Sequence, residues 1–260
     1  TPVPEFEAHP GIWYSIISGD FDNDGDNDLV AGNIGENIRF RVSEKYPMNM
    51  YVLDFEMDGI VDPIMTSFWP DAKGDMKEYP VNYLDELWSQ SPYLKAKLRN
   101  YTTFSAMEAK DLIPPKMAAN AAKLNINTVA SCIIWNNGKS FTFQRLPVEM
   151  QLSPVKKMIA ADLNKDGYQD LIAGGNDYSY EVPTGNFDAC KGIVLINRLS
   201  SGKREDRPFE LLGPAQSGLL LQGMLESMLW FEGDTSFIVA GFNRADAKLF
   251  VKSEYSVKKQ

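Results

Sequence analysis

The chain is poor in the side chains that most catalytic and zinc sites use. It has 260 residues with one histidine and two cysteines. A typical zinc site needs several nitrogen or sulfur ligands, and a serine or cysteine triad would have to use His9. We therefore expect neither role for His9. Cys132 and Cys190 have no metal-ligand or redox spacing, so they could pair in an oxidising compartment or remain buried free thiols.

Long apolar runs and basic stripes are also missing. No run reaches eighteen apolar residues, so we expect no membrane span. The net charge is −9, and without a basic stripe to meet phosphates we expect no nucleic-acid binding. Hydrophobic residues make up 44% and charged residues 23%, which is typical of a soluble globular protein. The chain begins at Thr1 and shows no signal-peptide pattern, so we expect a mature protein or an excised piece.

What the sequence has in excess is acidic loops. The stretch Asp20-Phe-Asp-Asn-Asp-Gly-Asp-Asn-Asp28 holds five carboxylates, which repel each other unless a cation lies among them. Calcium accepts six to eight oxygen ligands in flexible geometry. Gly25 permits the sharp turn that would fold the loop round the ion. The expected ligands are the side chains of Asp20, Asp22, Asp24 and Asp28 and the backbone carbonyl of Asp26.

Two further stretches share this pattern. They run from Asp54 to Asp62 and from Asp162 to Asp170, and all three fit D-x-[DNE]-x-D-G-x-x-D. The alternative is a set of solvated acidic turns. The three loops carry more negative charge than the whole chain, so the remainder is slightly positive. We expect two to three Ca²⁺ ions, with Glu56 making the second site the least certain. The additional expected ligands are Asp54, Glu56, Asp58, Ile60 and Asp62 in the second loop, and Asp162, Asn164, Asp166, Tyr168 and Asp170 in the third, with Ile60 and Tyr168 using their backbone carbonyls.

Each loop is followed by an apolar run typical of a strand, such as Leu29-Val-Ala-Gly-Asn33 and Leu171-Ile-Ala-Gly-Gly175. This argues against a helix-loop-helix calcium site, which ends in a bidentate Glu between helices. With Leu146-Pro147, Gln151 and Ser153-Pro154-Val155, the loops resemble the FG-GAP or VCBS repeats of integrin-alpha-like β-propellers. The chain is most similar to the large secreted VCBS-repeat proteins of Bacteroidetes-type bacteria, related to the cartilage acidic protein and UnbV group. The resemblance implies a calcium-binding, extracellular or cell-surface β-propeller with seven-bladed relatives.

The fold we expect is all-β with a helical insertion: one propeller-like domain, or a fragment of a larger propeller, over residues 1–260. Leu29, Leu171 and Ile238 open equivalent strands, and a repeat of this size suits a four-stranded blade. Residues 35–44 are expected to hold a short strand, 116–124 a helix and 200–207 an exposed polar linker. Glu232-Gly-Asp-Thr235 is too short for a calcium loop. The four expected blades are 10–46, 47–150 with the helical insertion 82–125, 151–213 and 214–256.

The function we expect is a non-enzymatic binding or adhesion-like module in which calcium is structural. The ligand would be an unidentified protein or glycan, and the chain could also belong to a larger polypeptide. One alternative is a catalytic or non-catalytic part of a polysaccharide-active enzyme, in which Trp69, Trp88, Trp135 or Trp230 would stack on sugar rings. Another is a subunit of a surface assembly, which would show an exposed apolar patch or an open sheet edge.

Overall fold

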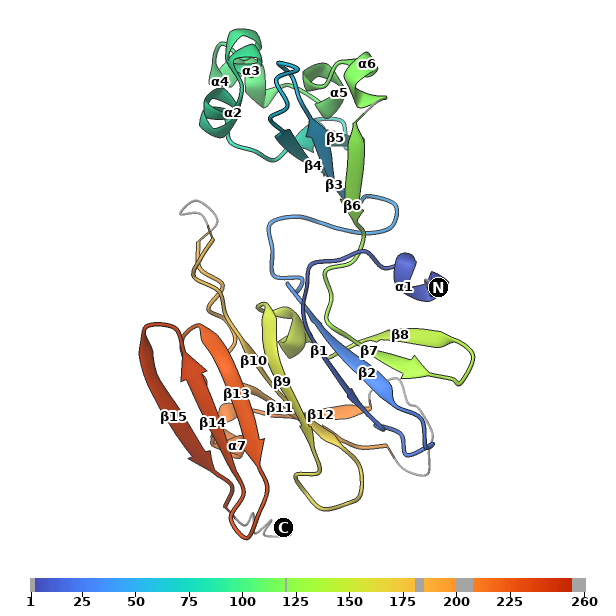
Figure 1. Ribbon diagram of the computed structural model, residues 1–260, viewed down its shortest axis with the longest axis vertical. Coiled ribbons are helices and arrows are strands. Elements are labelled where there is room, and N and C mark those ends of the chain that lie inside the picture. Colours follow the sequence, from blue (N-terminus) through green and yellow to red (C-terminus); the bar gives the residue numbers. More distant parts are fainter. Residues whose placement is uncertain (1–2, 120, 181–184, 200–207, 254–260) are drawn as a thin grey trace. The chain divides into compact units, whose positions relative to one another are not determined.

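The computed structural model describes residues 3–119, 121–180, 185–199 and 208–253. The chain is mostly β, with four antiparallel sheets and a few short helices (Figure 1). It divides into two compact units, one of residues 12–37 and 130–260, the other of residues 1–11 and 38–129. The expected linker 200–207 lies outside the described residues.

The larger unit holds three sheets, each a meander that follows chain order. The first has the order β1-β2-β7-β8, the second runs from β9 to β12, and the third from β13 to β15. Their bounds are β1 Trp13–Gly19, β2 Asp28–Asn33, β7 Cys132–Asn136, β8 Phe141–Arg145, β9 Val155–Ala161, β10 Asp170–Gly175, β11 Ile193–Asn197, β12 Phe209–Leu212, β13 Leu225–Phe231, β14 Phe237–Phe242 and β15 Ala245–Val251. Two short helices, η1 Val148–Gln151 and α7 Pro214–Ser217, lie between strands.

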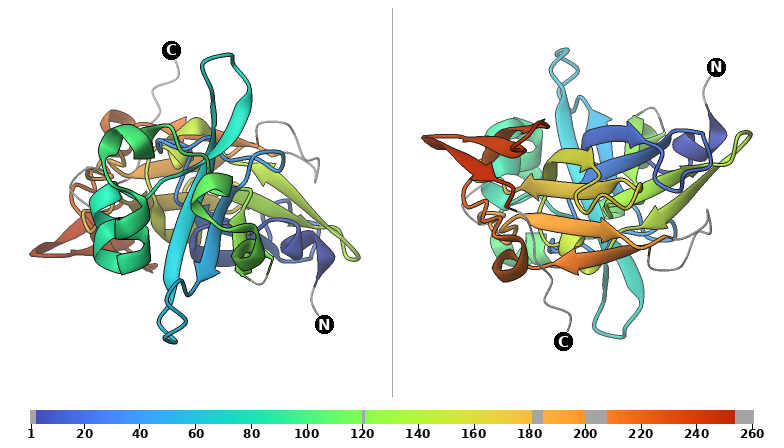
Figure 2. Two further views of the ribbon diagram at one scale, coloured as in Figure 1. Left: turned by 90° about the horizontal axis from the view of Figure 1, so that it is seen from above. Right: turned by 90° about the horizontal axis from the view of Figure 1, so that it is seen from below.

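These three sheets pack through their first strands. Strand β9 lies against both β1 and β13, an arrangement visible in the right-hand view of Figure 2. Apolar residues from the facing sheets fill the space between them, with Phe21, Val30, Trp135, Leu171 and Leu195 among those buried in one cluster. The first strand of the middle sheet therefore lies between the first strands of the other two sheets.

The first sheet is completed by a hairpin that the sequence placed in the second blade. Leu29 of β2 pairs with Ile134 of β7, and β7 pairs with β8 through the turn at Gly138. Residues 130–146 thus belong with 12–37, and residues 38–129 are inserted between them. The predicted strand within 35–44 is wrong, because the described chain has no strand there and the edge of β2 is already paired with β7.

The smaller unit is a four-stranded sheet with helices packed against it. The strand order is β5-β4-β3-β6. Leu53 and Ile64 from the sheet bury against Leu84, Leu94 and Leu112 from the helices. Its elements are α1 Pro4–Glu7, β3 Met48–Leu53, β4 Asp62–Pro70, β5 Met76–Pro80, α2 Leu84–Gln90, α3 Pro92–Lys97, α4 Tyr101–Ser105, α5 Ala109–Leu112, α6 Pro115–Ala118 and β6 Ala122–Ile126.

The helices expected in the insertion are present, but the last of them ends earlier than expected. The helix expected over 116–124 stops at Ala118, and residues 122–126 form β6, which pairs with β3 from Met48↔Ile126 to Val52↔Ala122. Pairing with the free edge of β3 satisfies backbone groups that a short polar helix would leave to water. Across the described residues, none of the helices combines the length and hydrophobicity needed to cross a bilayer.

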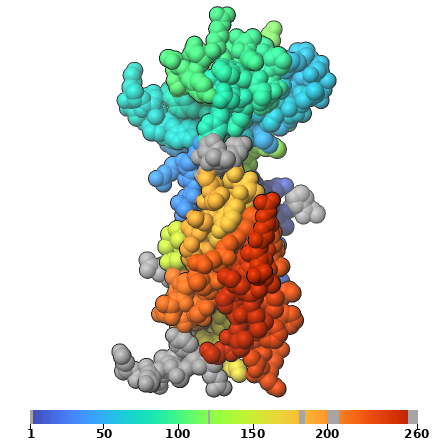
Figure 3. All heavy atoms as spheres, turned by 90° about the vertical axis from the view of Figure 1, so that its left-hand side faces the viewer, coloured from blue at the N-terminus to red at the C-terminus, as the bar shows by residue number. Residues whose placement is uncertain are grey.

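The last sheet has one covered and one open face. Met228, Ile238 and Ala240 are buried against the neighbouring sheet. The register places a second set of apolar side chains on the opposite face. This set is largely exposed, with Leu229 59% and Leu249 60% accessible, and Figure 3 shows β13 to β15 at the surface in orange and red. We call this set the open face, and it consists of Leu229, Phe231, Phe237, Val239, Leu249 and Val251.

The described residues do not form a closed propeller.

The two cysteines are free and buried in the larger unit. Burial raises the pKa of the Cys132 thiol to about 12 and also raises that of Cys190. Because the thiolate is the reactive form, we expect iodoacetamide to label neither residue in the folded protein, while both react in denaturant. Mass spectrometry of alkylated peptides checks this. Rapid labelling of Cys132 in the native protein would contradict the burial.

Candidate metal centre

The three acidic loops adopt the same backbone conformation. The fourth residue of each has a positive φ, at 58° for Asn23, 56° for Met57 and 61° for Lys165. The sixth is a glycine with φ between 86° and 95°. Left-handed conformations at these two positions turn the chain sharply twice, and glycine adopts them without steric cost. The motif therefore encodes a specific loop shape, not only a run of charge.

The first aspartate of each loop holds this turn together. Asp20 Oδ1 accepts from the backbone N–H of Asp24 at 3.2 Å, and its Oδ2 accepts from Gly25 at 3.1 Å. Asp54 and Asp162 accept from the equivalent two N–H groups at 2.9–3.2 Å. Each oxygen still has a second lone pair, so these bonds leave the carboxylates able to bind a cation.

In each loop, a hydrogen bond joins the side chain of the fifth residue to the backbone of the seventh. The fifth-position carboxylates of Asp24, Asp58 and Asp166 each accept from the N–H of the seventh residue, at 2.8–3.0 Å. The side chains of Asp26 and Ile60 are exposed, and Tyr168 is half-buried against the core. The backbone carbonyls of these three residues remain the predicted ligands at this position.

The ninth aspartate is buried in all three loops, with 0% of Asp28, 2% of Asp62 and 0% of Asp170 accessible. One carboxylate oxygen accepts from the N–H of the second loop residue: Phe21 at 3.2 Å, Phe55 at 3.0 Å or Leu163 at 2.7 Å. This bond joins the two ends of the loop at the base of the hairpin.

In the larger unit the ninth aspartate also reaches the next strand. Asp28 Oδ1 accepts from Asn136 N at 2.8 Å, and Asp170 Oδ1 accepts from Asn197 N at 2.8 Å. Burial raises the pKa of Asp170 to about 6, although these backbone N–H donors act in the opposite direction. A buried carboxylate that keeps its charge needs positive partners, and a cation in the loop would supply them.

The first loop brings its carboxylates closest together. Ligand oxygens of Asp20, Asp22 and Asp28 all lie within 4.8 Å of one another, and Asp22 and Asp28 are buried. Three converging carboxylates fit a hard cation such as Ca²⁺, which prefers oxygen ligands. Asp24 instead faces the N–H of Asp26. Of the five residues expected here, the structure therefore gathers three side chains at one point.

The third loop has an amide in place of one of these carboxylates. Asn164 occupies the position of Asp22, and its Nδ2 donates to Asp166 Oδ2 at 2.7 Å. The amide oxygen accepts from Asp166 N at 3.1 Å. An amide oxygen remains a suitable calcium ligand, but among the expected side-chain ligands this loop offers one carboxylate fewer than the first.

The second loop differs because its third residue faces a helix. Glu56 Oε1 accepts from Ser91 Oγ at 2.6 Å and from Tyr93 N at 2.9 Å. Ser91 is the N-cap of α3, and these bonds lower the pKa of Glu56. Burial raises the pKa of the neighbouring Asp62. Through Glu56, this loop is hydrogen-bonded to α3. This use of the Glu56 carboxylate agrees with the expectation that the second metal site is the least certain of the three.

Two of the loops are joined to each other within the larger unit. Asn23 Nδ2 donates to Gly167 O at 2.9 Å. Asn197 Nδ2 donates to Phe21 O at 2.7 Å and to Gln169 O at 3.1 Å. Sequence reasoning did not identify Asn197, because it lies in a strand outside the motif. The only available signal was a polar residue closing the apolar run Ile193-Val-Leu-Ile.

No family model, curated protein or solved structure matches this chain.

Proposed function

We propose that the chain is a calcium-stabilised extracellular binding module, with Ca²⁺ held in the first and third acidic loops and more weakly in the second. The observation that carries this proposal is the convergence of Asp20, Asp22 and Asp28 within a loop shape that recurs twice. Bound calcium would offset repulsion among the carboxylates and fix each hairpin, so metal binding would be linked to folding.

A propeller-like arrangement of the sheets is part of the proposal. Each sheet of the larger unit is an antiparallel meander, and β9 lies between β1 and β13. Successive blades of a propeller also pack through neighbouring sheets, with the first strand of each nearest the axis. In this arrangement the joined first and third loops lie at the same end of adjacent blades, which is where calcium loops of FG-GAP or VCBS type would occur.

Calcium removal tests the metal proposal. We expect about two to three Ca²⁺ per purified chain. Excess chelator should lower the thermal midpoint by about 10 °C, because the carboxylates lose their counter-charge. Metal analysis by mass spectrometry and thermal unfolding measure the two effects. A chain without bound calcium and with an unchanged midpoint would refute the proposal.

A matched pair of variants locates the ions. Asp20→Asn should remove about one ion per chain, because it weakens the ligand set of the first loop. Asp234→Asn changes an equally acidic residue in the short connection between β13 and β14, where no calcium loop is expected. It should leave the metal content unchanged. Equal loss in both variants would indicate nonspecific binding of calcium by surface charge.

A second candidate role is membership of a larger surface assembly. The open face of the last sheet favours it, since Leu229, Leu249 and Val251 are each more than half accessible. Contiguous exposed apolar residues commonly mark interaction surfaces. Sedimentation of the unaltered chain and of Leu249→Lys would show whether this face associates. A monomer in both cases, at any concentration tested, would exclude self-association through it.

A further inference from the structure

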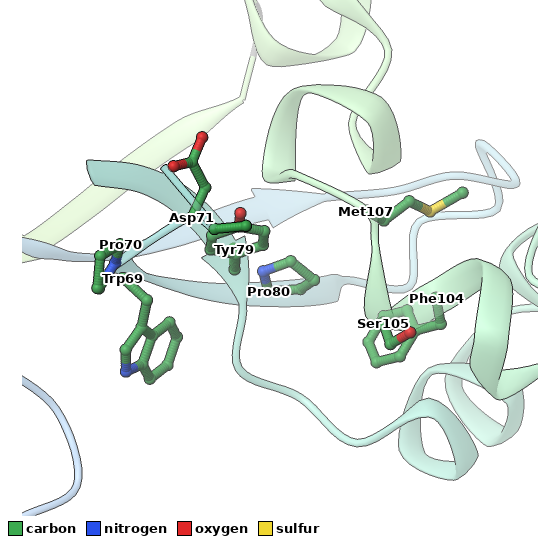
Figure 4. Close-up of a pocket in the computed structure, with 9 residues that line it drawn as sticks. Trp69, Pro70, Asp71, Tyr79, Pro80, Phe104, Ser105 and Met107 are labelled. Carbon is green, nitrogen blue, oxygen red and sulfur yellow. The ribbon is translucent and has the colours of Figure 1, made fainter. Parts of the chain in front are cut away.

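A groove in the smaller unit lies at the edge of its sheet. It has a volume of about 470 Å³, within the range of small-molecule sites. Nine residues from the β4–β5 hairpin and from the α4–α5 segment line it (Figure 4). They are Trp69, Pro70, Asp71, Ala72, Tyr79, Pro80, Phe104, Ser105 and Met107.

We propose that this groove binds the pyranose rings of a neutral oligosaccharide. Three aromatic side chains line it, and all are half-buried, so part of each ring is accessible. The axial C–H groups of a pyranose form an apolar face that packs on the electron-rich face of an aromatic ring. The proposal rests on the proposed role of the chain as a binding module, and it names the ligand class.

Of the four tryptophans considered for sugar stacking, only Trp69 lines this groove. Trp135 is 1% accessible, and Trp88 donates its Nε1 hydrogen to Leu98 O at 2.5 Å within the helical core. Trp230 packs at the edge of the core cluster between the last two sheets. Trp69 makes an edge-on contact with Phe40, with ring centroids 5.7 Å apart. The structure therefore selects one of four candidates.

The polar groups at the rim are held in place before any ligand arrives. Asp71 Oδ1 accepts from Lys73 N at 2.8 Å and from Asp75 N at 2.9 Å, which fixes the carboxylate in the hairpin turn. On the other wall, Ser105 Oγ donates to Thr102 O at 3.0 Å and keeps its lone pairs for accepting. Fixed acceptors reduce the entropy lost when they bind sugar hydroxyls.

The shape favours a chain of rings over a compact cation. In Figure 4, Trp69 lies at one end of the groove and Phe104 at the other, with Tyr79 and Pro80 between them. An aromatic cage for a quaternary ammonium group would need its rings around a single point. Aromatic side chains spread along the lining in this way suit consecutive pyranose units. The lining contains one carboxylate, Asp71, and Lys77 lies beside it as the cross-strand partner of Trp69, so opposite charges balance near the groove and suit a neutral sugar.

The edge strand disfavours an added peptide strand. Val81 N donates to Met65 O within the sheet. Because hydrogen bonds alternate along an antiparallel pair, the neighbouring Pro80 faces the open edge of β5, where it has no N–H to donate. Strand addition relies on main-chain hydrogen bonds, and this edge lacks one of its donors. Recognition through side-chain faces is therefore the better fit.

Binding of soluble neutral oligosaccharides by the full chain in calcium tests the proposal. Isothermal calorimetry would use cello-, manno-, xylo- and galacto-oligosaccharides. We expect at least one series to bind, and Trp69→Ala to weaken that binding by about tenfold or more. Asp71→Asn should also weaken it without removing aromatic surface, so it tests the site if Trp69→Ala is unstable.

Tyr101→Ala is the matched control. Tyr101 lies in α4 close to Phe104 in sequence, and it is 57% accessible, but it does not line the groove. The Tyr101→Ala variant should bind sugar with the same affinity as the unaltered chain. Absence of binding to every series would overturn the proposal, and so would Trp69→Ala and Asp71→Asn variants that bind as tightly as the unaltered chain. Binding of a proline-rich peptide in place of sugar would overturn it too. A failure of the sugar proposal can be told apart from a failure of the calcium proposal, because the chelation experiment measures unfolding and not sugar binding.

Discussion

Replacing Asp28 by alanine should lower the free energy of unfolding by about 4 kcal/mol. The buried carboxylate accepts from two backbone N–H groups, Phe21 at the start of the first loop and Asn136 in β7. Each buried donor left without a partner costs about 1–3 kcal/mol, and the first loop also loses one of its proposed metal ligands. For a chain of this size the thermal midpoint should fall by about 10 °C, measured in excess calcium.

Two further variants separate the causes. Asp26→Ala removes an exposed carboxylate from the same loop and should change stability by less than about 0.5 kcal/mol. Asp28→Asn keeps one acceptor oxygen, so its stability should lie between those of Asp28→Ala and Asp26→Ala. If Asp28→Ala unfolds at the same temperature as Asp26→Ala, Asp28 does not hold the hairpin to β7. If only the metal content changes, the aspartate acts through calcium alone.

The local part of this site could be predicted from sequence because the motif encodes its own conformation. Gly25, Gly59 and Gly167 occupy left-handed positions, and Asp28, Asp62 and Asp170 begin the returning strands as expected. These features depend on residues within one loop. Spacing alone was therefore enough to place the turns and the strands that enter and leave them.

The connections between distant segments could not be predicted in this way. The pairing of β2 with β7 joins residues about a hundred positions apart, across an inserted unit. Local periodicity gives no preference between β7 and a nearer strand, so the hairpin was assigned to its neighbours in sequence. For the same reason, the sequence did not point to Asn197, which donates to backbone carbonyls of the first and third loops. Nor did it point to Ser91, which donates to Glu56 of the second loop.

The glycine near the end of each of the returning strands β2 and β10 has a packing role that composition does not reveal. A Cβ at Gly32 would overlap the carbonyl oxygen of Val155 and lie 2.5 Å from Ser15 Oγ, where Ser15 donates to that same carbonyl at 2.6 Å. Gly32 thus allows the first sheet to approach β9 closely. The equivalent Gly174 faces only the side-chain ends of Leu225 and Leu221, at 2.6 and 2.9 Å.

Gly32→Ala should therefore destabilise the chain by about 3 kcal/mol, because a backbone carbonyl in the neighbouring sheet cannot move without displacing β9. Gly174→Ala should cost about 1 kcal/mol, since leucine side chains can change rotamer. Denaturant unfolding of both variants measures the difference. Equal stabilities would show that the contact between β2 and β9 is loose, and the close packing of these sheets would then need another cause. A large loss confined to Gly32→Ala would establish that the close approach of β2 to the Val155 carbonyl contributes to stability.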